Sequence, residues 1–191
     1  MDDFNRTCDW AFIDLGFAEK SKSCGTLLND GAPQVMQFSA MQTWLQGVVK
    51  TMAGPLNLVI EAPLSVAFNS NGNPTGRAIE RRGSLTRYWY VGLGTTVLVA
   101  ATYLLRSLQE VDADGNIRLI EGLASFKDRG VQSDHAGDVV DLRSVAWGLE
   151  SGQGRVIPAS ELARDKSDVI ESAFKVSGMD FGIPPVVTLG A

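Results

Sequence analysis

WAFIDLGFA, residues 10–18, is the stretch of sequence that decides the expected fold. It is a short apolar run that holds a single carboxylate, Asp14. A continuous apolar run of this length is typical of a central strand that is buried on both faces of a sheet, whereas a half-exposed strand alternates apolar and polar residues. We therefore predict a central β-strand here, followed by a turn in the polar residues EKSKS.

Similar patterns predict the remaining elements. Two strand-sized runs on either side of NDGAP complete an antiparallel meander with the first strand, and two later apolar runs, LNLVIEA and IRLIEGL, predict buried strands that each carry one acid. The predicted strands are residues 10–18, 24–28, 35–38, 56–62 and 117–123, with a closing strand in VVTL near the C-terminus. The predicted helices are residues 39–53, 88–110 and 133–148 and an amphipathic stretch in the tail, 159–176.

This order of elements predicts an α/β fold. We expect a mixed five-stranded sheet, three antiparallel strands followed by parallel strands, flanked by helices. The length of 191 residues fits one domain spanning residues 1–191. The expected core covers about residues 10–150, and the C-terminal helix and strand extend it over residues 151–191.

Two stretches in the middle of the chain call for an interpretation. Residues 63–87 are rich in Asn, Gly, Ser and Arg, and a compact domain keeps such a long segment for function or leaves it disordered. Residues 88–105 are apolar and approach the length of a membrane span, but glycines and threonines dilute them and arginines flank them. We interpret them as a buried core helix rather than a membrane segment.

The overall composition narrows the class of protein. A formal net charge of −5 weakens the case for a protein that coats nucleic acid through bulk electrostatics, although a local basic groove stays open. Cys8 and Cys24 form no CxxC motif, and His135 is the one histidine, so neither structural zinc nor a disulfide framework is expected. The acidic N-terminus carries no apolar run typical of a secretory signal, and we expect a cytoplasmic protein without a membrane anchor.

The buried-strand carboxylates carry the chemical prediction. Asp14, Glu61 and Glu121 each lie in an apolar strand, and Asp138 and Asp141 lie near the start of the last core helix. A buried carboxylate is costly unless it is paired, hydrogen-bonded or bound to a cation, so several of them converging in one cleft predict a divalent metal site. Mg²⁺ or Mn²⁺ suits oxygen ligands.

These residues give the chain a resemblance to the ribonuclease H-like superfamily. Members carry an acid on the first strand, another at the end of the fourth and one or two on the last helix, positions that Asp14, Glu61 and Asp138 match. The H-x-x-D of His135 and Asp138 resembles the last-helix motif of RuvC-type junction resolvases. Within the superfamily the chain is most similar to the predicted nucleases of domain-of-unknown-function family 429, although Glu121 is followed by GLAS instead of a proline.

The resemblance implies a metal-dependent nuclease or phosphodiesterase that uses two metal ions on DNA or RNA. Asp14 would bridge both ions, Glu61 and Asp138 would complete the coordination of the ions, and Glu121 or Asp141 would be an auxiliary residue of the site. His135 would orient water or the scissile phosphate. The substrate phosphates would be held by Arg77, Arg81 and Arg82.

Other interpretations stay open at this point. Asp14 is also compatible with an ordinary strand end, Asp138 and His135 with helix capping, and the arginines with a solvated face paired to Glu80. The chain is then an inactive ribonuclease H-like scaffold or regulatory protein. A third alternative is an ATP-binding actin-like fold, because DLGFAEKSKSCGTLL resembles the first phosphate hairpin of that group. The oligomeric state is open too, with a homodimer among the alternatives.

Overall fold

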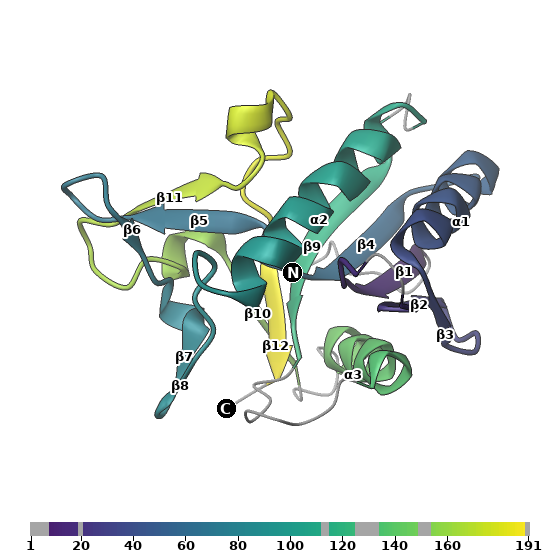
Figure 1. Cartoon of the computed structure of the whole chain (residues 1–191), viewed down its shortest axis with the longest axis horizontal. Helices are drawn as coiled ribbons and strands as arrows, with labels where there is room; N and C mark the ends of the chain where they lie inside the picture. The colour runs from purple at the N-terminus through teal and green to yellow at the C-terminus, as the bar shows by residue number, and fades with distance from the viewer. Residues whose placement is uncertain (1–7, 19–20, 112–114, 125–133, 149–153, 190–191) are drawn as a thin grey trace.

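A seven-stranded mixed β-sheet forms the centre of the molecule, with strand order β10-β12-β9-β4-β1-β2-β3 (Figure 1). The computed structural model describes residues 8–18, 21–111, 115–124, 134–148 and 154–189. The strands of this sheet are β1 Asp9–Asp14, β2 Cys24–Leu28, β3 Gln34–Met36, β4 Leu56–Glu61, β9 Ile117–Leu123, β10 Gly154–Ile157 and β12 Val186–Leu189. The α/β class predicted from the sequence is therefore confirmed.

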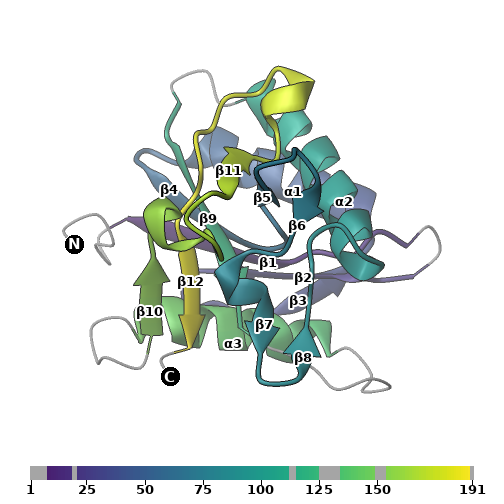
Figure 2. The same cartoon turned by 90° about the vertical axis from the view of Figure 1, so that its left-hand side faces the viewer.

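Strand directions follow the expected change from antiparallel to parallel. β1, β2 and β3 pair antiparallel, whereas β1 pairs parallel with β4, and β4 pairs parallel with β9. The closing strand predicted in VVTL is β12, which pairs parallel with β9. The prediction of five strands missed β10, a four-residue strand in a polar segment, which lies antiparallel beside β12 at one edge (Figure 2).

Within the described residues, three α-helices cover the two faces of the sheet (Figure 1). α1 (Phe38–Thr51) and α2 (Leu93–Gln109) pack on one face, and α3 (His135–Trp147) packs on the other. Side chains alternate along β1, because successive residues of a strand point to opposite faces. Ala11 and Ile13 join the core under α1 and α2, and Trp10 and Phe12 join the core under α3.

The helix predicted for residues 88–110 begins later in the structure, at Leu93. Gly92 precedes α2 with φ 56°, a left-handed conformation that glycine adopts without steric cost. Residues 88–91 therefore form turns ahead of the helix. In the part of the chain that the structure describes, α2 included, no helix combines the length and apolar character needed to cross a membrane. The predicted start of the last core helix at Ser133 lies outside the described residues.

The prediction of an amphipathic helix over residues 159–176 is wrong. The segment instead forms a 3₁₀ turn (Ala159–Glu161), the strand β11 (Val169–Ser172) and a second 3₁₀ turn (Lys175–Ser177). β11 pairs antiparallel with β5, and the neighbouring Phe174 is fully buried against the core under α1 and α2. Long-range pairing and burial therefore override the local helical pattern.

The polar segment 63–87 folds into short elements rather than one long loop. β5 (Ser65–Phe68) lies between β11 and β6 (Pro74–Thr75) in a small three-stranded sheet. A 3₁₀ turn (Ala78–Glu80) leads into a hairpin of β7 (Arg81–Arg82) and β8 (Leu85–Thr86), which projects from the body of the molecule (Figures 1 and 2). This segment contains four arginines, Arg77, Arg81, Arg82 and Arg87.

One glycine allows α3 to approach the sheet closely. Gly25 on β2 pairs with Asp14 on β1, and both point toward the face that α3 covers. A Cβ atom added to Gly25 would lie 2.1 Å from the backbone carbonyl oxygen of His135, the first residue of α3. Only a residue without a side chain therefore lets the start of α3 lie beside the end of β1.

We expect the substitution Gly25→Ala to lower the free energy of unfolding by at least about 1–3 kcal/mol, because the clash is with backbone rather than with a flexible side chain. Gly47→Ala in α1 is the matched control. A Cβ atom there meets nothing within 4 Å, so this variant should gain about 0.5–1 kcal/mol. Urea denaturation of both variants measures the effect, and equal stabilities would contradict the close approach.

Candidate metal centre

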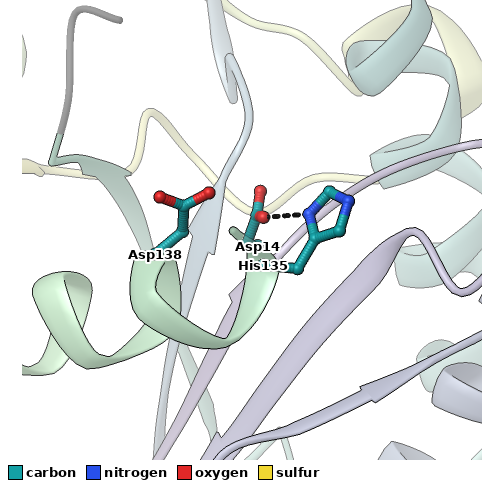
Figure 3. Close-up of side chains that lie close together, drawn as sticks. All are labelled: Asp14, His135 and Asp138. Atoms are coloured by element: carbon teal, nitrogen blue, oxygen red, sulfur yellow. Dashed lines mark hydrogen bonds and ion pairs between the residues drawn. The ribbon is translucent and has the colours of Figure 1, made fainter. Parts of the chain in front are cut away.

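Asp14, His135 and Asp138 come together where β1 ends and α3 begins (Figure 3). One potential ligand atom from each side chain lies within 4.8 Å of the other two. Asp138 is buried, and Asp14 and His135 are partly exposed. This group of two carboxylates and one imidazole could hold a metal ion.

The start of α3 explains why His135 and Asp138 lie on the same side. The Asp134 side chain caps the helix by accepting a hydrogen bond from the Gly137 backbone N–H at 3.2 Å, so His135 is the first helical residue. Residues three apart on a helix are neighbours on its surface. The positive end of the helix dipole also favours an acid in this first turn, which Asp138 provides.

His135 and Asp14 form the shortest contact of the centre. The imidazole Nδ1 lies 2.5 Å from Asp14 Oδ2, a distance that requires a proton between the two atoms. Figure 3 shows that Nδ1 is the ring nitrogen turned toward the carboxylates, whereas Nε2 points away. A cation at the centre would take the place of this proton, because a ligating imidazole nitrogen must be deprotonated.

Glu61 lies beside this group at the end of the neighbouring strand. The parallel register pairs Glu61 with Asp14, so both carboxylates point to the face that α3 covers. Glu61 is only 7% exposed, and its Oε1 accepts a hydrogen bond from Arg87 Nη1 at 3.1 Å. The pKa of Glu61 is raised to about 7, mainly by burial; Arg87 lowers it, and the charges of Asp14 and Asp138 raise it.

The raised pKa makes stability depend on pH. Glu61 takes up its proton more readily in the folded chain than in the unfolded chain, so its protonation stabilises the fold at low pH. This contribution is lost as pH rises through about 7. Between pH 5 and pH 8, wild type should lose about 2–3 kcal/mol of unfolding free energy relative to Glu61→Gln, which cannot titrate. Urea denaturation in EDTA measures it, and parallel pH profiles for the two proteins would contradict it.

Glu121 lies on the opposite face of the sheet from Asp14 and Glu61. It is aligned with Ile60, whose side chain belongs to the core under α1 and α2. Both carboxylate oxygens accept hydrogen bonds from Arg77, Oε1 from Nη2 at 2.8 Å and Oε2 from Nη1 at 2.7 Å, and Oε2 also accepts one from the Leu64 N–H. The structure therefore corrects the prediction that Glu121 is an auxiliary metal ligand.

Arg77 is likewise not available to a substrate. It is only 3% exposed, and besides Glu121 it donates to Ser65 and Glu80. The predicted phosphate-binding role of Arg77 is corrected to that of a buried ion pair. Glu80 extends this network, because its carboxylate also accepts hydrogen bonds from the backbone N–H groups of Arg77 and Trp89.

Substitution of Arg77 should be strongly destabilising. Arg77→Met leaves the buried carboxylates Glu80 and Glu121 without their cation, and loss of one partner from a buried ion pair costs about 3–5 kcal/mol. Arg155→Met is the matched control, since Arg155 forms an exposed pair with Glu161, and it should change stability by less than about 1 kcal/mol. Thermal and urea denaturation distinguish the two, and a similar small effect for both would remove the structural role of Arg77.

The remaining predicted site residues lie outside the group of three. Asp141 is exposed on α3, and the cluster does not include it. Arg81 and Arg82 are exposed on the projecting hairpin. Arg87, the last residue of the polar segment 63–87, is not among the site residues predicted from the sequence, and in the structure it forms an ion pair with Glu61. Its position depends on long-range packing, so the sequence carries no spacing signal for it.

Comparisons with protein-family models, with curated proteins and with solved structures find no match for this chain. The arrangement of the side chains is therefore the basis for assigning a function. Acids from two adjacent strand ends and a helix start, with a histidine among them, form an arrangement that could hold a cation.

Proposed function

We propose that the chain is a metal-dependent phosphodiesterase of the ribonuclease H-like type that acts on nucleic acid. The observation that carries the proposal is the convergence of Asp14, His135 and Asp138, with Glu61 beside them. An ordinary strand end or a helix cap explains each residue alone, but neither brings four ionisable groups from three separate elements to one place. Buried acids at such a density favour a bound cation.

The order of the central strands supports the proposal. β3-β2-β1-β4-β9 follows the pattern implied by the resemblance, with three antiparallel strands and then parallel ones. Asp14 ends β1, Glu61 ends β4 and Asp138 lies on α3, the last helix of the described chain. These are the three positions at which the resemblance implies metal-binding acids.

Asp14, Asp138 and His135 Nδ1 are the groups that would hold the cation. Two carboxylates suit Mg²⁺ and Mn²⁺, and an imidazole ligand shifts the preference toward Mn²⁺. When bound, such an ion supplies charge to a phosphate oxygen and lowers the pKa of a coordinated water. Glu61 lies where it would accept a proton from water or contribute a further ligand.

Exposed arginines on the β7–β8 hairpin and directly after it support a polyanionic substrate. Arg81 and Arg82 extend from the β7–β8 hairpin, and Arg87 follows it directly in sequence. Guanidinium groups bind phosphate oxygens in a bidentate manner, which suits a nucleic-acid backbone. The start of α3 adds the positive end of a helix dipole at the centre itself.

Activity of purified protein tests the proposal. With Mn²⁺ the chain should cleave at least one substrate in a panel of labelled single-stranded, duplex and branched DNA and RNA. Asp14→Asn and Asp138→Asn should each lower the rate by roughly 100-fold or more, because they remove charge at the centre. Asp141→Asn, an exposed acid on the same helix, should retain the wild-type rate within about threefold.

Calorimetry with Mn²⁺ provides an independent readout. Wild type should bind the ion, and Asp14→Asn should lose that binding while keeping its fold. Binding without cleavage of any substrate in the panel would favour a non-catalytic relative of the fold. No Mn²⁺ binding at millimolar concentration would refute the metal centre.

A further inference from the structure

Arg87 brings a positive charge to the edge of the candidate metal centre. Its Nη1 lies 3.1 Å from Glu61 Oε1, and Glu61 is paired in register with Asp14. The Arg87 side chain is 43% exposed, whereas the Glu61 side chain is almost completely buried. A solvated cation thus reaches inward to a buried carboxylate next to the group that could hold a metal.

The backbone around Arg87 is held in place by the buried ion network. Its N–H donates to the Glu80 carbonyl oxygen at 2.9 Å, and the N–H of Trp89 donates to the Glu80 carboxylate at 2.8 Å. Glu80 is held in turn by Arg77, which is anchored by Glu121 on β9. The main chain at Arg87 is therefore held by hydrogen bonds to Glu80 and its neighbours.

Resting on the proposed function, we infer that Arg87 is an internal cation that competes with a divalent metal ion for Glu61. Two positive charges close to one carboxylate repel each other, so a metal ion that binds Glu61 weakens its ion pair with Arg87, and the ion pair in turn weakens metal binding. Removal of this positive charge should therefore strengthen metal binding at Glu61.

The competition also separates two kinds of cation position. Asp14, Asp138 and His135 form one group that could hold a cation, and Glu61 belongs to a second position for which Arg87 competes. Binding at the first position is expected to need less rearrangement than binding that recruits Glu61. Arg87 therefore acts as a positioning residue that sets the metal concentration at which the centre is completed.

Calorimetric titration of Mn²⁺ into the metal-stripped full chain at pH 8 tests the inference. Arg87→Met should bind Mn²⁺ roughly tenfold more tightly than wild type at the position that uses Glu61, because no ion pair has to be broken. Arg87→Lys keeps the positive charge and should stay within about threefold of wild type. Arg155→Met, which removes an exposed arginine from an ion pair on β10, should leave the affinity unchanged.

A double-mutant cycle assigns the effect to Glu61. In a Glu61→Gln background, Arg87→Met should produce no further gain in Mn²⁺ affinity, because the contested carboxylate is absent. Addition of Mg²⁺ should also move the ¹⁵Nε NMR signal of Arg87, which is identified by its loss in Arg87→Met. The signal should not move in Glu61→Gln.

The possible failures are distinguishable. Equal Mn²⁺ affinities for wild type and Arg87→Met, together with an unmoved Arg87 signal, would overturn the competition and leave the metal centre intact. A gain in affinity that persists in the Glu61→Gln background would also overturn it, because the effect would then be general electrostatics. Absence of Mn²⁺ binding in every variant would refute the proposed function together with the inference.

Discussion

The parallel pairing of β1 with β4 is the constraint on which the site depends. Its register sets Asp14 beside Glu61 at the ends of two buried strands, with both side chains on the same face of the sheet. Adjacent carboxylates in a buried position repel each other and lose solvation, so the fold has to supply positive charge or protons at this place. His135, Arg87 and the raised pKa of Glu61 are three responses to this one electrostatic problem.

The opposite face of the sheet also contains a buried carboxylate, but its charge is neutralised in a different way. Glu121 on β9 is neutralised permanently by Arg77, with hydrogen bonds to both carboxylate oxygens and almost no exposure to solvent. The pair is completed by Glu80 and Ser65, which use further donors of the guanidinium group. A network of this kind specifies structure, whereas the α3 face carries two buried acids, Glu61 and Asp138, beside the partly exposed Asp14 in a group that could hold a cation.

The two charge systems are connected through the segment between β4 and α2. Glu80 belongs to the buried network, and its backbone and side chain hold the main chain at Arg87 and Trp89. The buried ion pair thus fixes the base of a side chain that reaches the candidate centre on the other face. The buried network on one side of the sheet and the candidate centre on the other are therefore connected by a stretch that reads, in sequence, as an irregular polar loop.

Local patterns in the sequence determined the α/β class, five strands of the main sheet and its closing strand, three core helices, and Asp14, Glu61 and Asp138 as candidate metal ligands. The sequence predicted His135 as a residue that orients water or phosphate, and the structure adds it to the group that could hold a metal ion. Apolar runs, turn residues and an i, i+3 spacing on a helix are local properties, which is why they could be read without a structure. Only the tertiary structure shows that Glu121 faces away from Asp14. A strand buried on both faces has no alternation of apolar and polar residues, so its sequence does not indicate which side chains point to which face. Only the tertiary structure shows that part of the predicted tail helix is the strand β11, that Arg77 is buried, and that Arg87 pairs with Glu61. Each of these features depends on pairing between residues far apart in the chain.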